Sequence, residues 1–137
     1  MGLVLTPYLN FNGTCEAAMN FYQAVLGGEL AIIRFKDMPM NGEVSESEEV
    51  MHSTLKANNI SLMASDSGMR SVIMGDSVNL FLAGSASDDP KLRGFFSSLS
   101  AGGTVSMPLS LAPWGAEFGM FTDKYGINWM INIETES

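Results

Sequence analysis

The residues that could do chemistry in this chain are few, because it contains one histidine, His52, and one cysteine, Cys15. A single imidazole, with no His-x-x-x-His spacing and no second thiol, predicts no metal site built on nitrogen and sulfur ligands. A lone cysteine also excludes a disulfide within the chain. General acid–base catalysis by His52, with a carboxylate as its partner, is the reaction type that remains.

Three carboxylates near expected strand ends could assist such a histidine, namely Asp66, Glu117 and Asp123. Glu117 stands out because it follows Trp114-Gly115 and begins a segment that is otherwise apolar, so His52 and Glu117 are the candidate catalytic residues. Asp66 is the alternative partner. Asp123 lies in a turn and is predicted to accept hydrogen bonds from its own loop. A solvated Glu117 and a structural His52 are the simpler interpretations, and they stay open here.

Cys15 falls at the start of an expected helix, where the helix dipole could lower the pKa of its thiol. No base is placed near it by the sequence. We therefore interpret Cys15 as a packed and inert thiol.

Apolar side chains could bind a ligand instead, since the chain contains 11 methionines, 8 phenylalanines and 2 tryptophans. Such side chains could line an adaptable cavity, although ordinary core packing explains each of them singly. The candidate ligand-binding residues are His52, Asp66, Trp114, Phe121 and Met130.

Charge and composition exclude several partners. Seven basic residues against 15 acidic ones give a net charge of −8, which repels nucleic acid. No apolar run approaches the roughly 18 residues of a membrane helix, and no basic leader precedes one, so a cytoplasmic location is expected. The glycine pairs Gly27-Gly28 and Gly102-Gly103 come after helices and not after strands. They predict helix ends, and no nucleotide or other cofactor is expected.

The elements that must position these residues form a repeated pattern. In the first half we expect a strand over 3–11, a helix capped by Thr14, and strands over 29–36, 50–57 and 60–65, with a solvated loop over 37–49. Asn58-Asn59 predicts the hairpin turn between the last two. Alternation places His52, Thr54 and Lys56 on one face of their strand.

The second half repeats the order strand, helix, strand, strand, strand. We expect a strand over 77–83, a helix that begins at Asp89-Pro90, and strands over 104–111, 117–122 and 128–133. The chain is thus read as a single α+β domain over 1–137, with one module over about 1–72 and a second over about 73–137.

Short motifs along nearly the whole chain resemble those of the PhnB-like proteins, which belong to the vicinal oxygen chelate superfamily with glyoxalase I, bleomycin-resistance proteins and extradiol dioxygenases. The resemblance is carried by Pro7-Tyr8-Leu9, Phe11-Asn12-Gly13, Phe21-Tyr22, Leu26-Gly27-Gly28, His52, Leu62-Met63, Ser65-Asp66, Met107-Pro108-Leu109, Trp114-Gly115, Phe118-Gly119, Asp123-Lys124-Tyr125-Gly126 and Trp129-Met130-Ile131-Asn132.

The resemblance implies paired βαβββ modules whose strands form a curled mixed sheet, an open cup. It also implies a homodimer that can exchange modules between its chains. In metal-using relatives the ligands lie at positions that fall here on Pro7, Ala64, Asn79 and Met130. These side chains are poor ligands, so the resemblance implies that the usual divalent metal site is lost.

Many PhnB-like relatives carry a histidine where this chain has Gly115-Ala116-Glu117. Some of them are labelled demethylubiquinone methyltransferases, but this chain has no recognisable glycine loop for adenosylmethionine. Three hypotheses follow. The first is a metal-free protein that binds a small molecule, the second a lyase or isomerase with His52 as general base, and the third a structural or interaction domain whose cup is filled by side chains.

Overall fold

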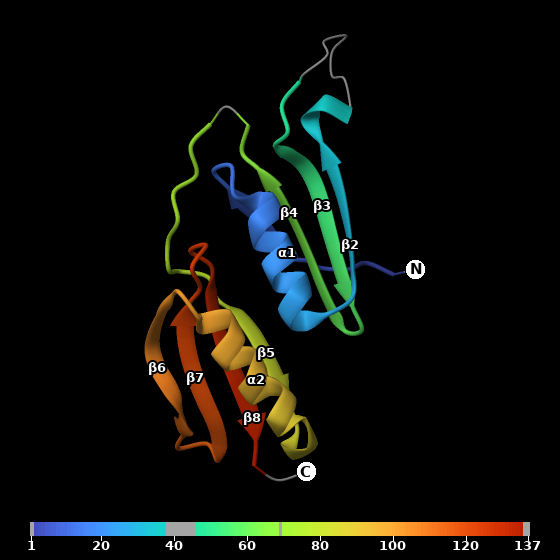
Figure 1. Cartoon of the computed structure of the whole chain (residues 1–137). Coiled ribbons are helices and arrows are strands. Elements are labelled where there is room, and N and C mark those ends of the chain that lie inside the picture. The colour runs from blue at the N-terminus through green and yellow to red at the C-terminus, as the bar shows by residue number, and fades with distance from the viewer. Residues whose placement is uncertain (1, 38–45, 69, 136–137) are drawn as a thin grey trace. The chain divides into compact units, whose positions relative to one another are not determined.

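The computed structural model describes residues 2–37, 46–68 and 70–135, which divide into two compact units, Met1–Ile73 and Met74–Ser137. Each unit consists of one helix on one face of a four-stranded mixed sheet (Figure 1). Most of the loop expected over 37–49 lies outside the described residues. Within the described ranges neither helix is long and apolar enough to cross a membrane.

Unit 1 contains one helix, four strands and a short 3-10 turn. In chain order the elements are β1 (Tyr8–Phe11), α1 (Cys15–Leu26), β2 (Glu29–Arg34), η1 (Phe35–Asp37), β3 (Val50–Ala57) and β4 (Ile60–Asp66). The sheet order is β1-β4-β3-β2, with β1 parallel to β4 and the other pairs antiparallel. Asn58, at φ 52°, forms the predicted hairpin turn between β3 and β4.

Unit 2 repeats this arrangement. Its elements are β5 (Leu80–Gly84), η2 (Ala86–Asp88), α2 (Asp89–Ser100), β6 (Thr104–Leu111), β7 (Ala116–Thr122) and β8 (Asn128–Glu134). The sheet order is β5-β8-β7-β6, and β5 is parallel to β8. The repeated βαβββ pattern and the α+β fold class predicted from the sequence are therefore confirmed.

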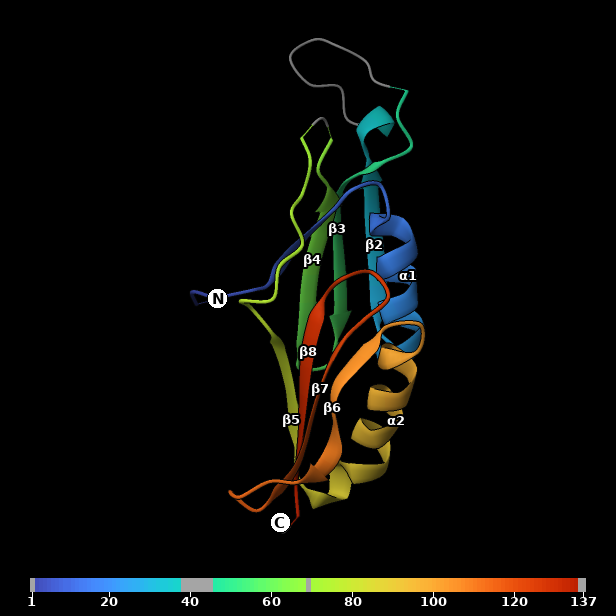
Figure 2. The same cartoon turned by 90° about the vertical axis from the view of Figure 1, so that its left-hand side faces the viewer.

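In both units the helix covers one face of the sheet, as both views show (Figures 1 and 2). Side chains alternate along a strand, so one set is buried under the helix and the other lies on what we call the open face. The largest fully buried side chains include Phe11, Tyr22 and Leu55 in unit 1 and Phe121 and Trp129 in unit 2.

A glycine after each helix permits close contact with the sheet. A Cβ on Gly28 would lie 2.2 Å from the carbonyl oxygen of Lys56, and one on Gly103 would lie 2.1 Å from that of Thr122. Gly28 also has φ +90°, which side-chain-bearing residues rarely adopt. These are the second residues of the two glycine pairs, so both pairs have the same packing role.

Two predicted strand starts are wrong. β1 begins at Tyr8 and not at Leu3, because Leu3 and Leu5 are 99% and 97% exposed and Pro7 has no amide hydrogen for a sheet. β5 begins at Leu80 and not at Ser77. The apolar residues that precede β1 and β5 therefore lie in chain that is not part of a strand.

Candidate functional site

His52 lies on the open face of unit 1, where two hydroxyl groups hold its ring. The Oη atom of Tyr8 is 3.0 Å from Nδ1, and the Oγ1 atom of Thr54 is 3.3 Å from Nε2. The rings of Tyr8 and His52 lie 5.7 Å apart between centroids. Tyr8 reaches His52 from β1 across β4, because both Tyr8 and Thr54 are in register with Met63. The imidazole is half-buried and has a fixed orientation.

Asp66 lies on the other face of the same sheet, buried beneath the start of α1. Its Oδ1 accepts a hydrogen bond from the backbone N–H of Cys15, and its Oδ2 accepts one from that of Val50, both at 2.9 Å. Thr14, the predicted cap, makes no side-chain hydrogen bond to the helix. Asp66 therefore caps α1 from a distant strand, and its carboxylate is engaged by backbone groups away from His52.

Glu117 lies in unit 2, on the face covered by α2. Its Oε1 is 3.4 Å from a guanidinium nitrogen of Arg93, which also pairs with Asp89 at 3.0 Å. The pKa of Arg93 is raised, chiefly by its hydrogen bond to Asp89 and further by Glu117. The carboxylate of Glu117 is thus part of an ion-pair cluster between β7 and α2 and does not face the open side of its sheet.

Cys15 is fully buried at the first residue of α1. Burial raises the pKa of its thiol to about 11, opposing a smaller lowering by the hydrogen bond with Ser53. Desolvation thus opposes the activation that a helix dipole could give a cysteine. The structure agrees with the interpretation of Cys15 as a packed thiol.

Trp114 lies at the open face of unit 2, on the tight turn between β6 and β7. The backbone N–H of Gly115 donates to the carbonyl of Ala112 at 3.0 Å, and Gly115 has φ +91°. The indole N–H donates to the Oδ1 of Asn132 at 3.1 Å, and the ring packs edge-on against Phe118 at 5.3 Å between centroids. Although its position is fixed by these contacts, Trp114 is 62% exposed.

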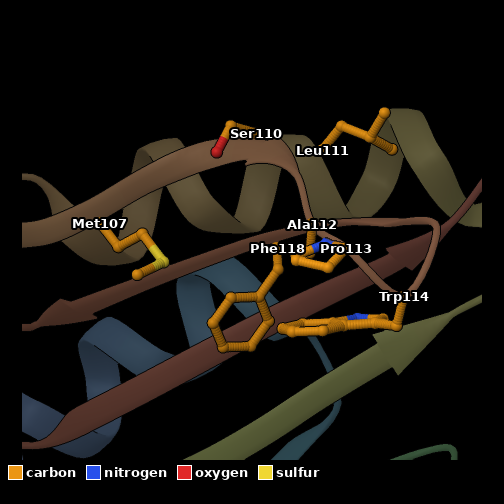
Figure 3. A pocket seen from close by; sticks show the side chains of 7 residues that line it. All are labelled: Met107, Ser110, Leu111, Ala112, Pro113, Trp114 and Phe118. Carbon is orange, nitrogen blue, oxygen red and sulfur yellow. The ribbon is translucent and has the colours of Figure 1, made fainter.

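A pocket of about 220 Å³ lies beside this ring (Figure 3). The residues that line it are mostly apolar and come from β6, the turn and β7: Met107, Ser110, Leu111, Ala112, Pro113, Trp114 and Phe118. Met130 and Phe81 extend the apolar open face, because they are in register on β8 and β5. This surface is formed by one unit alone.

Phe121 does not belong to this surface, contrary to its selection as a ligand-binding candidate. It is 1% exposed, packs edge-on against Phe96 of α2 and stacks on Trp129. The reason is the strand alternation. Phe121 shares its side of β7 with Gly119, where an added Cβ would lie 2.6 Å from Phe96 of α2, whereas Phe118 and Met120 lie on the other side. Phe121 is a core residue.

Metal-using members of the superfamily that the sequence resembles hold a divalent metal, and the residues present here do not fit one. Among the described residues no three His, Cys, Asp or Glu side chains are placed to hold a metal ion. Ala64 is fully buried on the helix-covered face, and the side chains of Pro7 and Met130 offer no hard ligand.

Tyr8, Thr54 and Phe118 are site residues that the candidate lists omitted. Strand alternation had already placed Thr54 beside His52. The contact of Tyr8 depends on the parallel pairing of β1 with β4, and no local pattern in the sequence specifies that register.

Comparison with known proteins gives the family. Residues 4–132 match the family described as 3-demethylubiquinone-9 3-methyltransferase. The chain is 30% identical to Protein YjdN of Escherichia coli (strain K12), over 94% of each protein. It is also similar to the crystal structure of protein PA1353 from Pseudomonas aeruginosa, with 35% identity, a TM-score of 0.81 and coverage of 97% of this chain and 98% of that one.

Two further solved structures place the fold. A PhnB protein from Bacillus cereus is 25% identical with a TM-score of 0.75, over 96% of this chain and 99% of that one. A glyoxylase/bleomycin resistance protein/dioxygenase domain from Frankia sp. EAN1pec has a TM-score of 0.64 at 12% identity, over 98% of this chain and 93% of that one. The second likeness shows a shared fold alone.

Proposed function

The chain belongs to the PhnB-like family of the glyoxalase/bleomycin-resistance/dioxygenase superfamily, and from that premise we propose that it binds a small molecule on the open face of unit 2 without a divalent metal. The ligand class is a molecule with an aromatic or apolar body and a positive charge. The supporting observation is Trp114, an indole that is fixed in orientation and yet 62% exposed.

A fixed and exposed indole favours binding because little side-chain freedom is lost when a ligand stacks on it. The hydrogen bond to Asn132 and the edge contact with Phe118 hold the ring before any ligand arrives. Asn132 is itself 6% exposed, and its amide also donates to Glu134 at 3.2 Å. The support of the ring is therefore buried and hydrogen-bonded through both the oxygen and the nitrogen of its amide.

The size and chemistry of the surface indicate what would fit. A pocket of about 220 Å³ is smaller than the roughly 300–1,000 Å³ of drug-sized sites, so it accommodates one ring or a short apolar group. The rest of the ligand would lie across the methionines of the open face, which adapt readily to different shapes. An indole face attracts cations, and the net charge of −8 adds a general attraction.

Ligand-induced stabilisation and fluorescence test this proposal. The full chain would be titrated with an N-methylquinolinium ion, cationic glycopeptides and S-adenosylmethionine, the last because the family description names a methyltransferase. A binder is expected to raise the melting temperature with concentration and to quench the emission of Trp114. The second tryptophan, Trp129, is 2% exposed and serves as an internal reference.

The matched variants are Trp114→Ala, expected to lose both responses, and Val78→Ala, expected to retain them. Val78 is an exposed apolar residue of the same unit, outside the pocket. Failure of every probe to stabilise or quench the wild-type protein would refute the proposal. Equal responses from Trp114→Ala and the wild type would place the ligand elsewhere and refute the assigned site.

A lyase or isomerase with His52 as general base is the second candidate. The two hydroxyl contacts that hold the imidazole favour it. Neither proposed carboxylate shares the face of His52 within its own unit, because Asp66 lies beneath α1 and Glu117 belongs to unit 2. An activity of this kind should fall at least roughly 100-fold in His52→Gln.

A further inference from the structure

The open face of unit 1 carries a row of polar side chains on β3. His52, Thr54 and Lys56 occupy alternate positions of this strand, so all three project to the same side. The two ring nitrogens of His52 each have one hydroxyl partner, Tyr8 at Nδ1 and Thr54 at Nε2. Within the described ranges these two hydroxyl groups make no other side-chain hydrogen bond. Each hydroxyl therefore retains unused hydrogen-bonding capacity toward the open side.

The tautomer of His52 determines whether each hydroxyl is still able to donate a hydrogen bond. A neutral imidazole has one N–H donor and one acceptor nitrogen, and a phenol is a stronger donor than an aliphatic alcohol. With Tyr8 as the donor to Nδ1, the ring hydrogen lies on Nε2. That N–H donates to the oxygen of Thr54, whose own hydroxyl hydrogen is left free to donate outward.

Lys56 provides a positive charge next to that free donor. It is exposed and forms no ion pair among the described residues. The other charged or titratable side chains toward this face are Tyr8 from β1 and Glu29 from β2, which is in register with Lys56. The residues of β4 on this side, Ser61, Met63 and Ser65, carry no charge.

We propose that Thr54 and Lys56 form a binding site for a carboxylate group, and that Tyr8 positions this site by fixing the tautomer of His52. Residues two apart on one strand face are separated by roughly 7 Å. A carboxylate between them can accept one hydrogen bond from the hydroxyl and a charge-assisted one from the ammonium group. Tyr8 is a positioning residue here and does not contact the ligand.

The single histidine makes the proposal directly measurable. In the ¹⁵N-labelled full chain, long-range spectra of the ring report the tautomer, at a pH where those spectra show the neutral imidazole. Acetate is the probe, with chloride at equal ionic strength as the control anion and inorganic phosphate as a second oxyanion. We expect the ring to be the Nε2–H tautomer. We also expect acetate to shift the amide signals of residues 52–56 in a saturable way, and chloride to leave these signals unchanged.

Four variants separate the roles. Thr54→Val and Lys56→Gln should each weaken acetate binding about fivefold, the factor that one hydrogen bond represents. Glu29→Gln should strengthen binding, because it removes the opposing charge. Tyr8→Phe should switch the ring to the Nδ1–H tautomer, turn the Thr54 hydroxyl inward and weaken acetate binding by a similar factor.

Thr104→Val, an exposed threonine of unit 2, is the matched control and should change neither the tautomer nor the binding. Absence of a saturable response beyond that of chloride overturns the site. A Tyr8→Phe variant that keeps both the wild-type tautomer and the wild-type affinity overturns the positioning role. The proposal does not depend on ligand binding at Trp114, because the two sites belong to different units and are read by different signals.

Discussion

The stability of this protein should decrease at alkaline pH in a way that depends on one atom, the sulfur of Cys15. The thiol is fully buried, and its pKa is raised from an ordinary 9.0 to about 11. Between pH 9 and pH 11 the thiol loses its proton in the unfolded chain, which lowers the free energy of the unfolded state. In the folded chain the thiol keeps its proton. The free energy of unfolding is thus unaffected below about pH 9 and falls as the pH rises toward 11.

The size of the effect follows from the shift. A pKa that rises from 9.0 to about 11 lowers the free energy of unfolding by about 3 kcal/mol at most, because each tenfold change in proton affinity corresponds to about 1.4 kcal/mol. Tyrosines and lysines also titrate in this range, so the thiol must be isolated by comparison with Cys15→Ala. That variant is tolerable because the hydroxyl of Ser53 still donates to the carbonyl of Ala64 at 2.8 Å.

Urea unfolding of both proteins at pH 7.5, 9, 10 and 11 measures the effect. The variant should be less stable at pH 7.5 by a constant packing loss, and the wild type should lose its advantage progressively above pH 9. A stability difference that stays constant from pH 7.5 to 11 would refute the reasoning.

In the same samples the folded thiol should react with a disulfide reagent only at the rate of unfolding, and rapid labelling would contradict the inert role.

Three further predictions concern the scaffold and the metal. Gly28→Ala should destabilise the protein by roughly 3 kcal/mol or more in urea unfolding, because its Cβ would meet the Lys56 carbonyl oxygen at 2.2 Å. The matched Gly27→Ala, with φ +83°, ψ −166° and no atom within 4 Å, should show only the backbone strain of roughly 1–3 kcal/mol, and so a smaller loss than Gly28→Ala. Asp66→Asn should lower the free energy of unfolding by roughly 2 kcal/mol, since a neutral amide cannot accept both backbone hydrogen bonds as the carboxylate does. Elemental analysis of protein purified without chelator should find less than one equivalent of any divalent metal, and a stoichiometric metal would contradict the mismatch in ligands.

The sequence predicted most of the fold because its signals are local. Apolar spacing set the two helices, glycine pairs ended them, and Asn58 marked a hairpin, all of which depend on neighbouring residues. The strand starts at Leu3 and Ser77 were wrong because apolar residues there have no partner strand. Composition alone cannot distinguish a β-forming segment that pairs from one that remains exposed.

The candidate sites were less accessible to sequence reasoning, because they depend on contacts distant in the chain. His52 and Trp114 were selected by type and do lie on open sheet faces. The engagement of Asp66 under α1 and the contact of Tyr8 with His52 both require the register of β1 and β3 with β4. Phe121 was also selected by type, and the alternation of side chains along β7 places it in the core and not on the open face.

The parallel pairing of the first and last strand in each unit also has a consequence for folding kinetics. Tyr8 pairs with Met63 and Leu80 with Trp129, so each contact closes a loop of roughly 50 residues. The hairpins β3–β4 and β7–β8 close over a few residues and should form first, whereas β1 and β5 join last. We therefore expect substitutions in the hairpins to slow folding and substitutions in β1 or β5 to accelerate unfolding. The strand synthesised first in each unit would then be the last to reach its place.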